Sequence, residues 1–173
     1  MKNLDILKNT LAECAEVPDS LLDKIQYNSN DSSLLYDVLF PLLGWDADNG
    51  YARFADGQFM EYMEWTEPYI DFDKFFIIKK HQLTIDTDDM FDDYEEAVGD
   101  EDEFDEMDFY DNYDSNRQYV LNYFSKKLAP HNLRFVELGL QDNAYFLLVH
   151  NDEQKIQNLI DAFDKFNIPV IVE

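Results

Sequence analysis

The stretch LRFVELGLQDNAYFLLVH, residues 133–150, decides the fold of this 173-residue chain. It contains two runs rich in aromatic, β-branched and other apolar residues, 133–140 and 144–150. Such runs are typical of strands. The three residues between them, 141–143, form a hairpin connection of common length. The sequence therefore predicts two antiparallel strands joined by a short turn.

Helical periodicity flanks this hairpin on both sides. The apolar residues before it that share one helix face are Tyr119, Val120, Tyr123, Phe124 and Leu128. Those after it are Ile156, Leu159, Ile160 and Phe163. Ser115 can cap the first helix and Pro130 ends it; Asn151 can cap the second and Asn167 stops it. The final residues, 169–173, are suited to a last strand.

A first strand is predicted at Phe75 to Ile78, the apolar run FFII. The acidic insert lies between this strand and the helix that precedes the hairpin. The predicted order over 75–173 is then strand, helix, strand, strand, helix, strand. This is the βαββαβ order of a ferredoxin-like sandwich, with an antiparallel sheet backed by two helices. We therefore expect an α+β core over 75–173 that carries an acidic insert at 86–114.

Residues 1–74 are predicted to form an N-terminal helical cap and a mixed connecting segment, in one compact unit with the core. Three apolar stripes indicate three short helices before Gly44: Leu4, Leu7 and Leu11; Leu21, Leu22 and Ile25; and Leu34, Leu35, Val38, Leu39 and Leu42. The segment 45–74 combines turn sequences with helical spacing at Phe59, Tyr62 and Met63.

Negative charge is concentrated in the insert. The chain has 38 acidic and 13 basic residues, a formal net charge of −25. Residues 86–114 hold 16 of the acids and no Lys or Arg. A chain with this charge is repelled by nucleic acid and by anionic membranes, and attracted to basic proteins. A solvated loop that only raises solubility is the alternative interpretation of such a run.

The densest part of the insert is the predicted partner-binding site. As a helix, residues 100–108 would carry about one charge per 2 Å, close to the one per roughly 1.7 Å of duplex DNA. We expect these carboxylates to meet Lys and Arg of a basic partner, with two aromatic residues as apolar anchors. The predicted site residues are Asp100, Glu101, Asp102, Glu103, Phe104, Asp105, Glu106, Asp108 and Tyr110.

The sequence contains no recognised catalytic spacing, so neither an enzyme nor a cofactor is expected. Cys14 is the single cysteine, which excludes an internal disulfide and a cysteine zinc site. The histidines His81, His131 and His150 are far apart, in no metal-binding spacing. Residues 46–50, DADNG, depart from a calcium loop at its later ligand positions and favour a turn. No apolar run predicts a signal peptide or a membrane span, so we expect the cytoplasm.

In size, charge and lack of catalytic motifs, the chain resembles the small acidic immunity proteins of bacterial toxin–immunity pairs. The resemblance rests on general character rather than on a motif, so it assigns no individual residues. It implies a non-catalytic inhibitor whose partner is a basic protein such as a nuclease toxin. Three alternatives stay open: a DNA mimic that inhibits a DNA-binding protein, an enzyme or small-ligand domain with its site between the helical cap and the sheet, and a weak, non-selective buffer of divalent cations in the acidic insert. The oligomeric state stays open as well.

Overall fold

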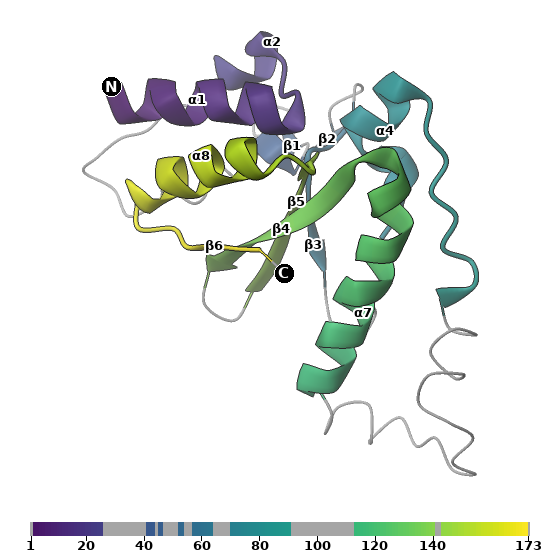
Figure 1. The fold of residues 1–173 in the computed structure, drawn as a ribbon. Helices are drawn as coiled ribbons and strands as arrows, with labels where there is room; N and C mark the ends of the chain where they lie inside the picture. The colour runs from purple at the N-terminus through teal and green to yellow at the C-terminus, as the bar shows by residue number, and fades with distance from the viewer. Residues whose placement is uncertain are drawn as a thin grey trace.

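The protein is an α+β fold in which helices cover both faces of a four-stranded antiparallel sheet (Figure 1). This computed structural model describes residues 2–25, 41–43, 45–46, 52–53, 57–63, 70–90, 113–140 and 143–172. Most of the third predicted N-terminal helix, and residues 91–112 of the acidic insert, therefore lie outside the described residues.

The sheet has the strand order β3 (Met60–Met63), β5 (Asn143–His150), β4 (Leu133–Leu140), β6 (Val170–Ile171), and all three strand pairs are antiparallel. The predicted hairpin is confirmed, because β4 and β5 pair along their whole length, from Leu133 opposite His150 to Leu140 opposite Asn143. A separate two-stranded sheet joins β1 (Trp45–Asp46) and β2 (Ala52–Arg53).

The described helices are α1 (Lys2–Ala15), α2 (Asp19–Leu22), α4 (Phe76–His81), α7 (Tyr113–Leu128) and α8 (Glu153–Asp164), with short 3-10 turns at Phe72–Lys74 and Ala129–His131. Both helices predicted around the hairpin are present. The N-cap of α8 is Asp152 rather than Asn151, and its carboxylate accepts a hydrogen bond of 3.0 Å from the backbone N–H of Lys155. A carboxylate at this position also favours the helix dipole.

Two apolar cores lie on the two faces of the sheet. Successive side chains of a strand point to opposite faces, and in β5 both sets are buried. Leu147 and Val149 pack with α1 and α8 in one core, whereas Phe146 and Leu148 pack with α4 and α7 in the other. This two-faced burial explains why residues 146–149 form an unbroken apolar run.

The ferredoxin-like topology is not confirmed. In that topology the last strand lies beside the first and both helices cover one face. Here β6 pairs with β4, at the edge opposite β3. The connections β3–α7–β4 and β5–α8–β6 each join parallel strands around one intervening strand, and they move the same way across the sheet. Since β3 and β5 run in opposite directions, right-handed connections require α7 and α8 to lie on opposite faces, as their packing shows.

The strand predicted at Phe75 to Ile78 is wrong. Phe75 makes only a single bridge to Gln58, and α4 begins at Phe76. A short apolar run does not distinguish a buried strand from a buried helix turn by its periodicity. The basic residues Lys79, Lys80 and His81 in its last turn favour the helix, because they complement the negative end of the helix dipole.

The first strand of the sheet comes from a different segment. β3 lies where the spacing of Phe59, Tyr62 and Met63 suggested a helix, and Tyr62 and Met63 belong to the strand instead. Met60 belongs to the core on one face of the sheet and Met63 to the core on the other, so burial at both ends obscured the alternation. The sheet therefore includes a strand that precedes residue 75.

The positive φ of Gly57 allows the turn that precedes β3. We predict that Gly57→Ala is destabilising. The φ of Gly57 is +116°, and an added Cβ would lie 2.8 Å from the carbonyl oxygen of Lys74. The adjacent backbone is fixed by bonds between Gln58 and residues 74 and 76. We expect a loss of about 2 kcal/mol in the free energy of unfolding, measured by urea denaturation.

Gly139→Ala is the matched control. Its added Cβ would meet Pro169 Cγ at 3.1 Å, a side-chain atom at the edge of the sheet, and its φ is not in the positive range. A smaller loss is expected there. Equal stability of Gly57→Ala and the wild type would contradict this account of the turn.

Candidate functional site

All nine predicted site residues, from Asp100 to Tyr110, lie outside the described residues. The structure does describe how the acidic segment 86–114 is attached to the fold, because the first residues of the segment, 86–90, are described and α7 begins at Tyr113, within its last residues.

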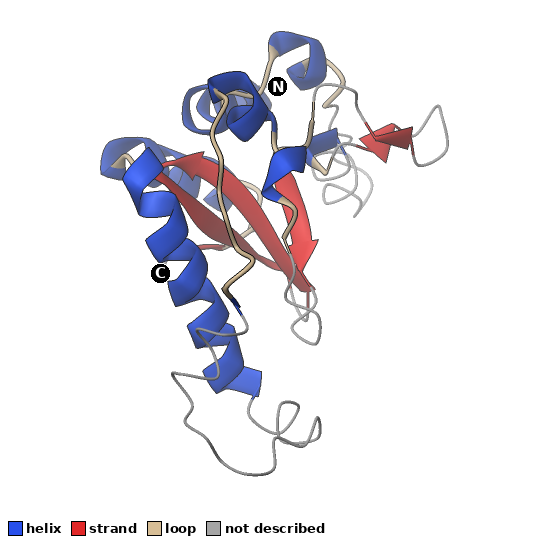
Figure 2. Cartoon of the chain, turned by 90° about the vertical axis from the view of Figure 1, so that its right-hand side faces the viewer, coloured by secondary structure: helices blue, strands red, loops and turns tan. Residues whose placement is uncertain are grey.

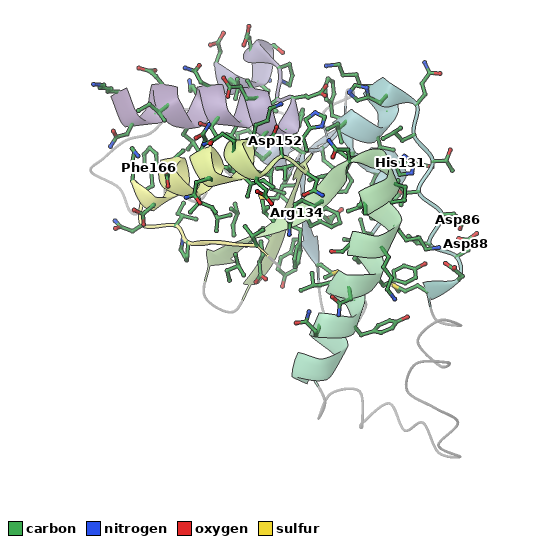
Figure 3. The ribbon with its side chains drawn as sticks, viewed as in Figure 1. Asp86, Asp88, His131, Arg134, Asp152 and Phe166 are labelled. Carbon is green, nitrogen blue, oxygen red and sulfur yellow. The ribbon has the colours of Figure 1, made fainter. Side chains whose placement is uncertain are left out.

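The acidic segment begins within residues 83–90, which we call the arm. Residues 83–87 have no regular secondary structure, and residues 87–90 form a turn in which the Met90 N–H donates to the Thr87 carbonyl at 3.2 Å. The arm follows α4 and runs beside α7 (Figure 2). Leu83 and Ile85 are partly buried against the core that contains α7, and Met90 is buried within it. Between them Asp86 and Asp88 are exposed, and their side chains extend away from the fold (Figure 3). Partly buried and exposed residues alternate from Leu83 to Asp88. The alternation ends at the turn, where the Asp89 carboxylate and Met90 both contact α7.

Three residues of α7 hold the end of the arm. Lys127 Nζ lies 2.7 Å and 2.9 Å from the two carboxylate oxygens of Asp89, and the Tyr123 hydroxyl donates a hydrogen bond to the same carboxylate. The Tyr119 hydroxyl donates to the backbone carbonyl of Met90 at 3.2 Å. The hydrogen bonds from Lys127 and then Tyr123 lower the pKa of Asp89, because both favour its charged form.

A second polar cluster surrounds Glu16, the residue that follows α1. Its Oε2 lies 2.5 Å from Lys80 Nζ, and its Oε1 lies 2.8 Å from His81 Nε2 and 2.7 Å from His150 Nε2. Lys80 and His81 belong to the last turn of α4, and His150 ends β5. One carboxylate therefore joins the N-terminal helices, α4 and the sheet.

Two features of this position are energetically unfavourable for Glu16. Its φ is +56°, a left-handed backbone conformation that residues other than glycine rarely adopt. A carboxylate at the C-terminal end of α1 also opposes the helix dipole. Burial raises the pKa of Glu16, but the hydrogen bonds from Lys80, His81 and His150 outweigh this effect and lower it to about 2. These three partners compensate for both costs.

Sequence reasoning missed this cluster. Glu16 is separated from His81 by 65 residues and from His150 by 134, so no local spacing reveals it. When neutral, each imidazole that donates its Nε2–H to Glu16 keeps its lone pair on Nδ1. Within the described ranges, no group of three or more His, Cys, Asp and Glu side chains is arranged to hold a metal ion.

Cys14 is the one further reactive group singled out from the sequence. It is fully buried, and its thiol donates to the carbonyl oxygen of Lys155 at 3.1 Å. Burial raises the pKa of this thiol to about 11. This environment favours a structural role for Cys14, because a thiol of such high pKa is a poor nucleophile.

Comparisons with known proteins do not place the chain in a family. No protein-family model matches the sequence, and no curated protein or solved structure matches it either. Among the helices that the structure describes, none is both long and apolar enough to cross a bilayer.

The Glu16 cluster predicts a specific loss of stability in acid. A carboxylate whose folded pKa is lowered contributes stability above its unfolded value of 4.5, and loses it as the pH falls towards about 2. Glu16→Gln removes the charge and leaves three donors around one amide. We expect it to cost about 1–2 kcal/mol at neutral pH. The difference from wild type should shrink below pH 4.5, as followed by urea denaturation across the acidic range.

Glu13→Gln is the control, because Glu13 is an exposed glutamate of α1, three residues before Glu16. It should change the unfolding free energy little at any pH. A Glu16→Gln difference that stays constant down to pH 2 would contradict the assigned role of the charge.

Proposed function

We propose that this protein is a non-catalytic acidic binding protein that occludes a basic partner, in the manner of an immunity protein that neutralises a bacterial toxin such as a nuclease. The observation that carries the proposal is the segregation of charge. Residues 86–114 hold 16 acids with no Lys or Arg, within a chain whose net charge is −25.

The mechanism follows from this segregation. A segment of one charge sign steers the encounter with an oppositely charged surface and raises the association rate. Carboxylates between Asp100 and Asp108 would then pair with Lys and Arg that line the partner's substrate groove. Phe104 and Tyr110 would supply the apolar contacts that hold the complex, since aromatic residues carry a large share of binding energy at interfaces. The groove is blocked without any turnover.

The described structure shows how the acidic segment is attached to the fold. The arm and α7, which carry its two ends, pack on the same side of the sheet. Among the described residues of the segment, Met90 is buried in the core on that side. We propose that residues 99–111 can be removed while the sheet and both cores are kept.

The small-ligand alternative would place its site between the N-terminal helices and the sheet. The described feature at that junction is the Glu16 cluster, where both carboxylate oxygens already accept bonds from Lys80, His81 and His150. This mutual pairing favours a structural role for the cluster, and so favours the binding-protein proposal.

Deletion of residues 99–111 tests the site directly. We expect the deletion variant to keep its circular dichroism spectrum and to lose binding to a folded cationic protein, for which lysozyme serves as the probe. Binding would be measured by calorimetry at low and at high salt, because screening weakens exposed charge pairs. An unfolded deletion variant, or one that binds as well as wild type, would refute the assignment.

A charge-matched comparison separates position from net charge. The variant D100N/E101Q/D102N removes three charges from the predicted site. The control D23N/D73N/D164N removes three from exposed residues on other elements. We expect the first to weaken lysozyme binding about ten-fold or more and the control less than three-fold. Equal losses would show that only total charge matters.

A further inference from the structure

We infer that two tyrosines of the sheet, Tyr62 and Tyr145, form a further contact surface for the basic partner, at which a Lys or Arg side chain packs on the ring of Tyr62. This inference rests on the proposed function, because it takes the partner to be a cationic protein. We call these two residues the tyrosine pair. Tyr62 belongs to β3 and Tyr145 to β5.

The two tyrosines are neighbours across the sheet. Tyr62 lies directly opposite Tyr145 in the antiparallel register of β3 and β5, so both side chains project from the same face. Their ring centroids are 5.3 Å apart, with an angle of 51° between the ring planes. Tyr145 is partly buried against the core that contains α1 and α8. Its ring therefore supports the ring of Tyr62 on that face.

Tyr62 is exposed, although its strand neighbours are buried. Its exposed fraction is 40%, against 0% for Met60 and 2% for Met63. Among the residues that the structure describes, the other large apolar side chains with similar exposure are Ile6 of α1 and Ile171 of β6. In this part of the chain, Tyr62 is thus the large apolar side chain that presents an aromatic ring to solvent.

The charge beside the tyrosine pair suits a cation. Glu61 precedes Tyr62 in β3, and its carboxylate accepts hydrogen bonds from Gln58 Nε2 and, at 3.2 Å, from the backbone N–H of Tyr62. Neither of these donors is charged. The strands β3, β5 and β6 contain no Lys or Arg. A cationic side chain that reaches Tyr62 therefore has a carboxylate at the adjacent position and no like charge on these three strands.

A Lys or Arg side chain is the occupant that this surface fits. The face of a tyrosine ring attracts ammonium and guanidinium groups that lie within about 6 Å of its centre. Tyrosine is also enriched among the residues that dominate binding energy at interfaces, and its side chain loses little entropy there. An acidic partner is disfavoured by Glu61 and by the net charge of −25. A purely apolar partner would gain as much from Ile171, which is equally exposed.

Tyr62→Leu tests the inference, and Ile171→Ala is its matched control. Both residues are 40% exposed and lie on the two outer strands of the same sheet, but only Tyr62 has an aromatic ring. We expect Tyr62→Leu to weaken lysozyme binding about three-fold to ten-fold, measured by calorimetry. Ile171→Ala should stay within about two-fold of wild type. Tyr62→Phe keeps the ring and should also stay within about two-fold.

A measurement on the wild type keeps the test independent of any folding defect in the variants. With isotope-labelled tyrosine, the ring signals of Tyr62 can be assigned by their loss in Tyr62→Phe. We expect these signals to shift when lysozyme is added. Urea denaturation of each variant shows whether a loss of binding reflects a loss of stability, and the shift in the wild type decides the matter where it does.

The outcomes separate the two proposals. If the wild type does not bind lysozyme, the proposed function fails, and the tyrosine pair loses its partner with it. If the wild type binds but the Tyr62 signals do not move and Tyr62→Leu binds as well as the control, the inference about the tyrosine pair alone is overturned. Equal losses in Tyr62→Leu and Ile171→Ala would indicate an apolar contact and would likewise overturn it.

Discussion

Both faces of β5 are buried, and this constraint organises the described structure. Leu147 and Val149 need one apolar layer and Phe146 and Leu148 need another, so the chain must supply helices on both sides of the sheet. α1 and α8 cover one face, and α4 and α7 cover the other. The handedness of the connections then sets where the strands can lie. With α8 opposite α7, the last strand joins the edge next to β4 rather than the edge next to β3.

Polar contacts join these layers at their margins. Glu16 links the end of α1 to α4 and β5 through one carboxylate. Tyr119, Tyr123 and Lys127 of α7 hold the end of the arm. The two sets of contacts lie at the two ends of the arm. Lys80 and His81 come just before its first residue, and Asp89 and Met90 are its last two residues. The arm, through which the acidic segment joins the fold, is thereby held at both of its ends.

The sequence was most informative where one pattern dominated. The β4–β5 hairpin was predicted from two runs rich in strand-forming residues with a short connection between them. The helices α7 and α8 were predicted because their apolar residues recur with a helical period. Prediction failed at short segments. FFII at 75–78 forms the start of α4, and the first strand comes from Met60–Met63. A run of four apolar residues carries too little periodicity to separate strand from helix. Its state is set by the layer on which it packs.

The candidate sites divide in a similar way. Local composition identifies the acidic segment, because a run of like charges is visible in any window of the sequence. The Glu16 cluster had no such signal. Glu16 is 65 residues from His81 and 134 residues from His150 in the sequence, so no local pattern connects them. The contacts between α7 and the arm were predicted only in part. Tyr119 and Tyr123 were assigned to the core face, yet their hydroxyl groups bind the arm.

The sequence by itself determined the α+β class, the hairpin at its centre and the place where negative charge gathers. These depend on short-range periodicity and composition, which neighbouring residues along the chain fully define. Only the tertiary structure decided the strand order, the opposite placement of α7 and α8, and the partners of Glu16 and Asp89. These depend on contacts between distant residues, whose geometry is fixed when both faces of the sheet are covered at once.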